Sequence, residues 1–178
     1  MRDNILAVSG RLDQTLYGPS VSPHRGEAKE YRRLFQGPLD GNGRRSIYLK
    51  VTRMEGPRFL ELFDLPPPLQ TRGNRDVTNV PSQSLALLND PFVLDQASVW
   101  AERLVARKDD AIDARLTSMF LQALARPPTP EELDRWRSLT SRLAGGQGIA
   151  ATEILASKTV WKDIAHTFFN TKEFLYLK

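Results

Sequence analysis

At 178 residues with 40% apolar content, the chain is long enough to bury one hydrophobic core but short for two full domains. Its formal charge of +4 comes from 25 basic and 21 acidic residues, an excess too mild for the dense basic face that nonspecific nucleic-acid binding requires. The chain has no cysteine, which excludes disulfide bonds, thiolate zinc ligands, thiol catalysis and haem attachment through a C-x-x-C-H motif.

The sequence also carries no membrane or export signal. Its apolar runs are far shorter than the roughly 20 residues of a membrane-spanning helix. Met1 is followed by polar residues instead of the apolar core of a signal peptide. We therefore expect no membrane span and no signal peptide in the chain as written.

The N-terminal part is predicted to be irregular. Residues 3–9 are typical of the last turns of a helix that Gly10 ends. Eight glycines and prolines between residues 16 and 43 favour loops and turns, with a short helix expected at 27–35. Residues 46–53 (SIYLKVTR) alternate apolar and polar side chains, which predicts a strand that pairs with the irregular region or lies extended against helices.

The C-terminal part carries clear helix signals. A short helix is predicted over residues 81–88, opened by Thr78 or Asn79, and a second begins at an Asp-Pro pair at 90–91. A third spans 111–125, and the sequence TPEE from Thr129 has the pattern of a capping box before a fourth. A last helix is expected from about residue 150. Three tryptophans on three of these helices are predicted to face a common core.

These signals predict a mainly α fold with a small helical bundle in the C-terminal half and an irregular, loop-rich N-terminal half that contains one short strand or extended segment. Residues 1–178 are expected to form a single domain, with an irregular arm at 1–75 and the bundle at 76–178.

The most unusual segment lies between the proline run at 66–68 and the Asp-Pro pair. Its side chains carry more hydrogen-bonding groups than a connector needs: Arg72, Asn74, Arg75, Asp76, Thr78, Asn79, Gln83 and Asn89. If this polar segment is buried, its groups must satisfy one another in an internal network. If it is exposed, it could bind sugar hydroxyls or an anion. We prefer the internal network over ligand binding, and ligand binding over catalysis.

Basic residues also gather upstream of that segment. They are Arg44, Arg45, Lys50, Arg53 and Arg58, followed by Arg72 and Arg75. Guanidinium groups bind phosphate, sulfate and carboxylate through forked hydrogen bonds, so these residues could form an anion site. A solvated face with internal ion pairs explains them equally and is the preferred interpretation.

Other candidate chemistry has simpler structural explanations. Neither His24 nor His166 has a second histidine at ligand spacing, so we expect no metal site and no cofactor. Asp163 and His166 could pair on one helical face. Ser82 and Ser84 lie near a helix start, and Glu131 and Glu132 lie in a first helical turn, where capping accounts for them.

Several segments resemble one known family. They are RDNILAVSGRLD, RRSIYLKVTR, TNVPSQSLALLNDPFVLDQASVWAERL, LARPPTPEELDRW and FFNTKEFLYL. They are similar to a planctomycete-specific C-terminal domain of unknown function in large exported proteins, many of which also carry a cytochrome-c-like domain. The NxPxQxLxLLNDP block is the most specific part. The resemblance implies that this chain is the C-terminal fragment of a periplasmic or cell-surface protein, and it carries over no activity.

Three functions therefore stay open. The first is a noncatalytic structural or interaction domain whose partners are other domains of the parent protein. The second is a carbohydrate- or anion-binding module that uses residues 72–79. The third is part of an enzyme whose site is completed by upstream sequence. The noncatalytic interpretation is preferred for this chain alone, and nucleic acid is not expected as a partner.

Overall fold

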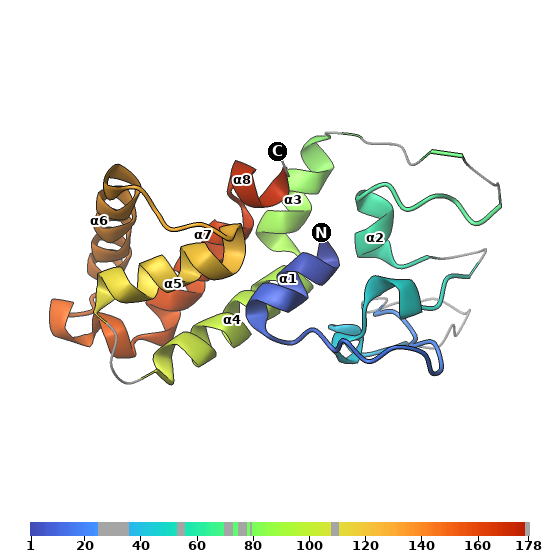
Figure 1. Cartoon of the computed structure of the whole chain (residues 1–178), viewed down its shortest axis with the longest axis horizontal. Helices are drawn as coiled ribbons and strands as arrows, with labels where there is room; N and C mark the ends of the chain where they lie inside the picture. The colour runs from blue at the N-terminus through green and yellow to red at the C-terminus, as the bar shows by residue number, and fades with distance from the viewer. Residues whose placement is uncertain are drawn as a thin grey trace. The chain divides into compact units, whose positions relative to one another are not determined.

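The computed structural model of the chain describes residues 1–24, 36–52, 56–69, 73, 74, 78, 80–107 and 111–176 (Figure 1). The fold is mainly helical, as the sequence predicts. The chain divides into two compact units, Met1–Phe92 and Val93–Lys178. The sequence prediction is a single domain with an irregular arm at 1–75 and a bundle at 76–178. Within the described ranges, no helix combines the length and apolarity needed to cross a membrane.

The first unit is built from short helices joined by long loops. In chain order they are α1 (Arg2–Ser9), the 3-10 helices η1 (Gly41–Gly43) and η2 (Ser46–Tyr48), α2 (Arg58–Leu62), α3 (Pro81–Asn89) and the start of α4 (Pro91–Val105). As expected, Gly10 ends α1: its φ of 79° is left-handed, a conformation that favours glycine. The short helix expected at 27–35 lies outside the described residues.

For residues 46–53 the sequence predicts a short strand or an extended segment, and no regular strand forms among the described residues 46–52. Ser46–Tyr48 adopts a 3-10 turn, and only Leu49 is buried, while Ile47 and Val51 are exposed. An isolated parallel bridge joins Val21 to Leu49, with Val21 N donating to Tyr48 O at 2.9 Å and Lys50 N donating to Val21 O at 2.9 Å. The alternation was misleading because one buried position is enough to anchor an extended segment.

A loop at residues 13–18 begins at an isolated bridge between Asp13 and Arg44, in which Asp13 N donates to Gly43 O at 2.8 Å, and the rest of the loop is held by side chains. The Arg44 guanidinium donates to Thr15 O at 2.9 Å and to Tyr17 O at 2.5 Å, and it lies 4.1 Å from the Tyr48 ring centroid. The Tyr48 hydroxyl accepts from Tyr17 N at 2.8 Å. Tyr17 has a φ of 65°, an unfavourable value for a non-glycine residue, and its side chain is 81% exposed.

Two helix starts follow the polar segment. Val80, not Thr78, is the N-cap residue of α3, and the buried Gln83 side chain accepts from Val80 N at 3.4 Å. Asn79, the other predicted opener, lies outside the described residues. The prediction for α4 is confirmed, because Asp90 Oδ1 accepts from Phe92 N at 2.8 Å just before the helix.

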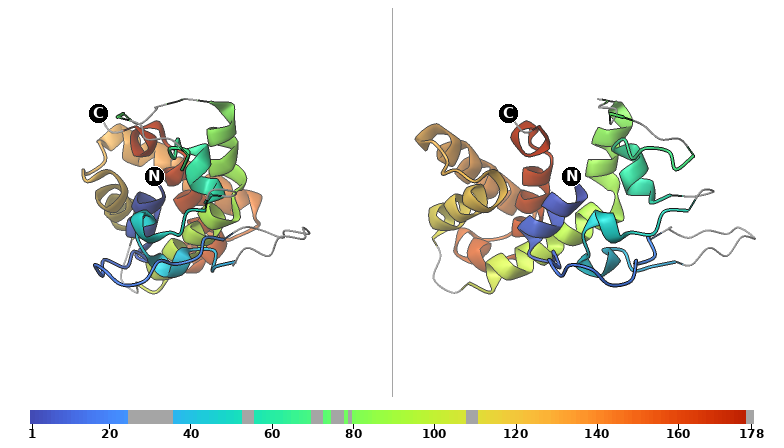
Figure 2. Two further views of the ribbon diagram at one scale, coloured as in Figure 1. Left: turned by 90° about the vertical axis from the view of Figure 1, so that its right-hand side faces the viewer. Right: turned by 45° about the vertical axis from the view of Figure 1, so that its right-hand side comes forward.

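The second unit is a helical bundle. After α4 come α5 (Ile112–Leu124), α6 (Pro130–Gly146), the 3-10 helix η3 (Ala151–Ala156), α7 (Lys158–Phe169) and α8 (Lys172–Leu175). α6 packs against α5, α7 and η3, and α8 contacts α5 and α7; α5, α6 and α7 lie as neighbours in Figures 1 and 2. The single last helix expected from residue 150 is two helices, because Ser157 accepts from Val160 N and starts α7.

An aromatic cluster forms the core of this bundle. Trp100 and Phe168 are fully buried, and their rings meet edge to face with centroids 5.7 Å apart. Trp136 is partly exposed but stacks on Phe168 at 4.0 Å. Trp161 is fully buried and donates its indole N–H to Ile154 O at 2.9 Å. The three tryptophans therefore help to form this core, as the sequence predicts.

The start of α6 carries the predicted capping box. Thr129 Oγ1 accepts from Glu132 N at 3.3 Å, and Glu132 Oε2 accepts from Thr129 N at 2.8 Å. Glu132 also binds Arg126 through both carboxylate oxygens, at 2.7 and 2.8 Å. Arg126 in turn holds Glu173 of α8 at 2.6 Å. One arginine therefore fastens α8 to the start of α6.

Candidate functional site

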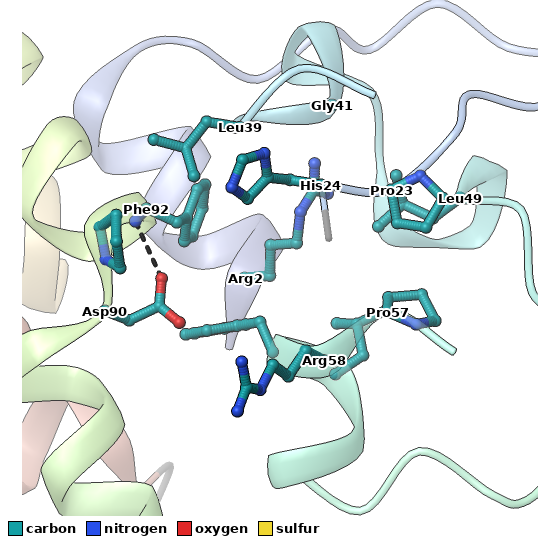
Figure 3. A pocket seen from close by; sticks show the side chains of 13 residues that line it. Arg2, Pro23, His24, Leu39, Gly41, Leu49, Pro57, Arg58, Asp90 and Phe92 are labelled. Carbon is teal, nitrogen blue, oxygen red and sulfur yellow. Dashed lines mark hydrogen bonds between the residues drawn. The ribbon is translucent and has the colours of Figure 1, made fainter. Parts of the chain in front are cut away.

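The first unit contains a pocket with a cavity volume of about 180 Å³ (Figure 3). We call it the unit-1 pocket. Eight of the thirteen described residues that line it are apolar: Pro23, Leu39, Leu49, Pro57, Phe59, Leu60, Pro91 and Phe92. Concave sites with mostly apolar walls and a few polar groups are the usual form of a ligand site.

Elements far apart in the sequence close this pocket. The turn of α2 brings Phe59 to Phe92 at the start of α4, with ring centroids 5.3 Å apart and nearly edge to face. The bridge between Val21 and Leu49 brings the adjacent Pro23 and His24 to the same wall. The apolar lining is thus assembled by tertiary contacts and not by one motif.

Arg2 lies at the centre of the view in Figure 3, and its guanidinium is already engaged. It is 5% exposed and donates to Asp40 O at 2.6 Å and to Arg44 O at 2.8 Å. Burial lowers the pKa of Arg2, and the nearby Asp3 and Asp40 carboxylates oppose that shift. The group stays charged, because arginine keeps its proton in proteins. Arg2 therefore ties α1 to the 40–44 turn.

Gly41 permits this close approach. A Cβ at Gly41 would lie 2.7 Å from Arg2 Nη2 and 3.0 Å from Leu49 Cδ2, and the φ of Gly41 is +60°. Both features favour glycine at this position.

The remaining polar groups of the pocket differ in their hydrogen bonding. Asp90 Oδ1 caps α4 by accepting from Phe92 N. His24 is half-buried and Arg58 is exposed, and neither makes a hydrogen bond or ion pair with another described residue. In the view of Figure 3, the His24 ring lies beside Leu39 and Phe92, and the Arg58 guanidinium lies on the other side of Arg2.

The polar side chains that line the pocket are Arg2, His24, Arg58 and Asp90. Among the described lining residues there is no hydroxyl or amine nucleophile, and His24 has no carboxylate partner to orient it as a general base. The apolar walls can surround a small apolar group. The Arg58 guanidinium then places a positive charge beside that group.

The predicted polar segment is only partly described. Arg72, Arg75, Asp76 and Asn79 lie outside the described residues. Asp64 accepts from both Thr78 N and Thr78 Oγ1, at 2.8 and 2.7 Å, and Gln83 Nε2 donates to Thr78 Oγ1 at 3.0 Å. Asn74 is exposed.

Asn89 is not part of that network. Its amide donates to Leu85 O at 3.1 Å, one turn earlier on the same helix. Of the predicted site residues that the structure describes, Thr78 and Gln83 therefore come together, and Thr78 alone binds Asp64.

The basic cluster separates into groups with different roles. Arg44 is 9% exposed and holds the 13–18 loop, whereas Arg45 and Lys50 are exposed. Arg58 lines the unit-1 pocket. Arg53 lies outside the described residues, like Arg72 and Arg75.

Two of the other candidate carboxylates have hydrogen-bond partners. Asp163 accepts from Gln147 Nε2 at 2.6 Å, and Glu132 closes the capping box of α6. Ser82 and Ser84 are exposed on α3. In the part of the chain that the structure describes, no group of three or more His, Cys, Asp or Glu side chains has the arrangement of a metal site.

The unit-1 pocket itself was not predicted. Most of its apolar residues lie outside the sequence motifs, and they come from segments up to 69 residues apart, from Pro23 to Phe92. The sequence signals among its residues were Arg58 in the basic cluster, His24 in a Gly/Pro-rich loop, and the Asp-Pro pair at 90–91.

Fold and site together define a mainly helical protein with a pocket sized for a single small group. Residues 1–140 match the profile of PSD1, described as a protein of unknown function (DUF1553), and the chain belongs to this family. The match includes the NxPxQxLxLLNDP block and the capping-box sequence, while the terminal FFNTKEFLYL lies beyond it. No curated protein and no solved structure was found to match the chain.

Proposed function

We propose that this chain is a noncatalytic interaction domain of a larger protein, and that the unit-1 pocket is where it binds an apolar group. The observation that carries the proposal is the apolar lining around a cavity of about 180 Å³ whose walls come from α1, α2, α4 and the loops between them. Support also comes from its polar groups, since Arg2 and Asp90 already bind backbone atoms. The planctomycete origin, export and cytochrome-c-like neighbours implied by the resemblance belong to the same proposal.

Saturation-transfer NMR with single-ring probes such as indole and phenol tests the pocket. We compare the wild type with Leu39→Trp, which fills the pocket, and with Leu121→Trp. Leu121 is 52% exposed on α5 in the second unit and serves as the matched control. We expect probe signals with the wild type and the control, and their loss with Leu39→Trp.

Two results would overturn the proposal. Equal probe binding by folded Leu39→Trp would show that the probes bind elsewhere. Conversion of a bound probe into a product by the wild type would contradict a noncatalytic role. Thermal unfolding followed by circular dichroism establishes that each variant is folded; if Leu39→Trp is not, Leu39→Phe replaces it as a smaller filling substitution.

A further inference from the structure

The size of the unit-1 pocket limits what it can hold. An apolar cavity of roughly 150 Å³ accommodates a benzene molecule, and this one measures about 180 Å³. Pockets for drug-sized ligands are larger, at roughly 300 Å³ and above. The pocket therefore fits one ring or one branched aliphatic chain with a short substituent, and it is too small for a polysaccharide segment.

The charges around the pocket indicate the nature of that substituent. Two of the four polar lining residues are committed to the fold, because Arg2 donates to the Asp40 and Arg44 carbonyls and Asp90 caps α4. Arg58 is exposed and forms no ion pair with Asp90 or with any other described residue. Its forked donors match a carboxylate, and the apolar walls beside it would exclude water from one side of that contact.

We propose that the unit-1 pocket binds a single apolar ring or branched chain that carries a carboxylate, with Arg58 binding the carboxylate. This inference rests on the proposed function, because it names the ligand of the same pocket. The same chemistry has two sources: a free aryl or alkyl carboxylate, and the C-terminal residue of a polypeptide that ends in an apolar side chain. Arg2 sets the shape of the pocket but does not bind the ligand, since its guanidinium donates to backbone carbonyls.

The test compares a charged and a neutral probe of the same shape, together with a dipeptide that ends in a phenylalanine carboxylate. Isothermal titration calorimetry with the full chain measures the affinity for 3-phenylpropanoate, for the neutral 3-phenylpropanamide and for the dipeptide acetyl-Gly-Phe. We expect the wild type to prefer the carboxylate over the amide by about tenfold, since charge-assisted hydrogen bonds are the stronger class. Arg58→Gln should lose that preference and still bind the amide as the wild type does.

Arg45→Gln is the matched control. Arg45 is exposed in the same unit, carries the same charge and does not line the pocket, so this variant should keep the tenfold preference. If both arginine variants lose it equally, the effect is one of net charge and the assignment to Arg58 is wrong. Dipeptide binding at least as tight as that of 3-phenylpropanoate identifies a polypeptide C-terminus as the source, and weaker binding identifies a free carboxylate.

The outcomes separate the two proposals. Equal binding of carboxylate and amide by the wild type overturns the carboxylate inference and leaves the apolar pocket standing. Absence of binding by all three probes contradicts both. Retention of the preference in folded Arg58→Gln overturns the role of Arg58.

Discussion

The contact between Arg126 and Glu132 makes the stability of the second unit depend on pH. Hydrogen bonds from Arg126 and from Thr129 N lower the pKa of Glu132 to about 2, from a usual value of 4.5. A shift of that size corresponds to about 3 kcal/mol of the free energy of unfolding. The Arg126 and Glu132 side chains are 34% and 29% exposed, so solvent screening reduces the contribution to about 1 kcal/mol.

The direction of the pH dependence follows from the lowered pKa. Between pH 4.5 and pH 2 the unfolded chain binds a proton at Glu132 that the folded chain does not bind. The stabilisation is therefore complete above about pH 5 and is lost as the pH falls toward 2. Glu132→Gln removes the charge but keeps a side-chain oxygen that can accept from Thr129 N.

Urea unfolding followed by tryptophan fluorescence measures this effect, because Trp100, Trp136 and Trp161 all lie in the second unit. We expect Glu132→Gln to lower the free energy of unfolding by about 1 kcal/mol at pH 7, and the difference from the wild type to shrink between pH 4.5 and pH 3. Glu153→Gln, an exposed position on η3, should change nothing. A difference that stays constant over this pH range, or that is absent at pH 7, would refute the reasoning.

Three further substitutions test the contacts that hold each unit. Gly41→Ala should destabilise the first unit by about 2–4 kcal/mol, because it places a Cβ at positive φ and displaces Arg2 from its carbonyls; amide hydrogen exchange in α1 measures this. Phe168→Ala should cost about 3–5 kcal/mol by emptying the site beside Trp136, measured by urea unfolding. Gln83→Ala should cost about 1 kcal/mol, seen as faster amide exchange at the start of α3.

Each of these has a control in the same unit. Gly73→Ala should leave α1 unchanged, because an added methyl group there would meet no atom within 4 Å beyond its neighbours in the chain. Phe168→Leu should lose less than Phe168→Ala, since it leaves a smaller cavity. Asn74→Ala, at an exposed position, should leave α3 exchange unchanged. Equal effects in a variant and its control would mean that the named contact is not the cause.

The elements that could be predicted are those whose signals are local. Thr129 and Glu132 lie three residues apart, and the side chain of each accepts from the backbone N–H of the other. Four consecutive residues are therefore enough to predict the start of α6. The left-handed Gly10 and the Asp90 cap follow the same logic. Their partners are close in sequence, and no tertiary contact is needed to form them.

The errors arose where distant residues decide the structure. Alternation at residues 46–53 indicates a strand only if a neighbouring strand pairs along its length, and Val21 pairs with it at one position. Thr78 donates to Asp64, fourteen residues earlier, and no sequence pattern predicts this hydrogen bond. The unit-1 pocket was the hardest feature to predict. A hydrophobic residue in the sequence indicates that its side chain is buried, but not which residues it contacts.

In the 13–18 loop, an exposed side chain belongs to a residue whose backbone is held in place. Tyr17 displays most of its ring to solvent, so its side chain is an obvious target for chymotrypsin, yet its carbonyl and N–H are held by Arg44 and Tyr48. A protease must draw several residues of backbone into an extended form before it can cut. Cleavage after Tyr17 would therefore report how often the Arg44 and Tyr48 contacts break, and limited proteolysis would follow the opening of the 13–18 loop.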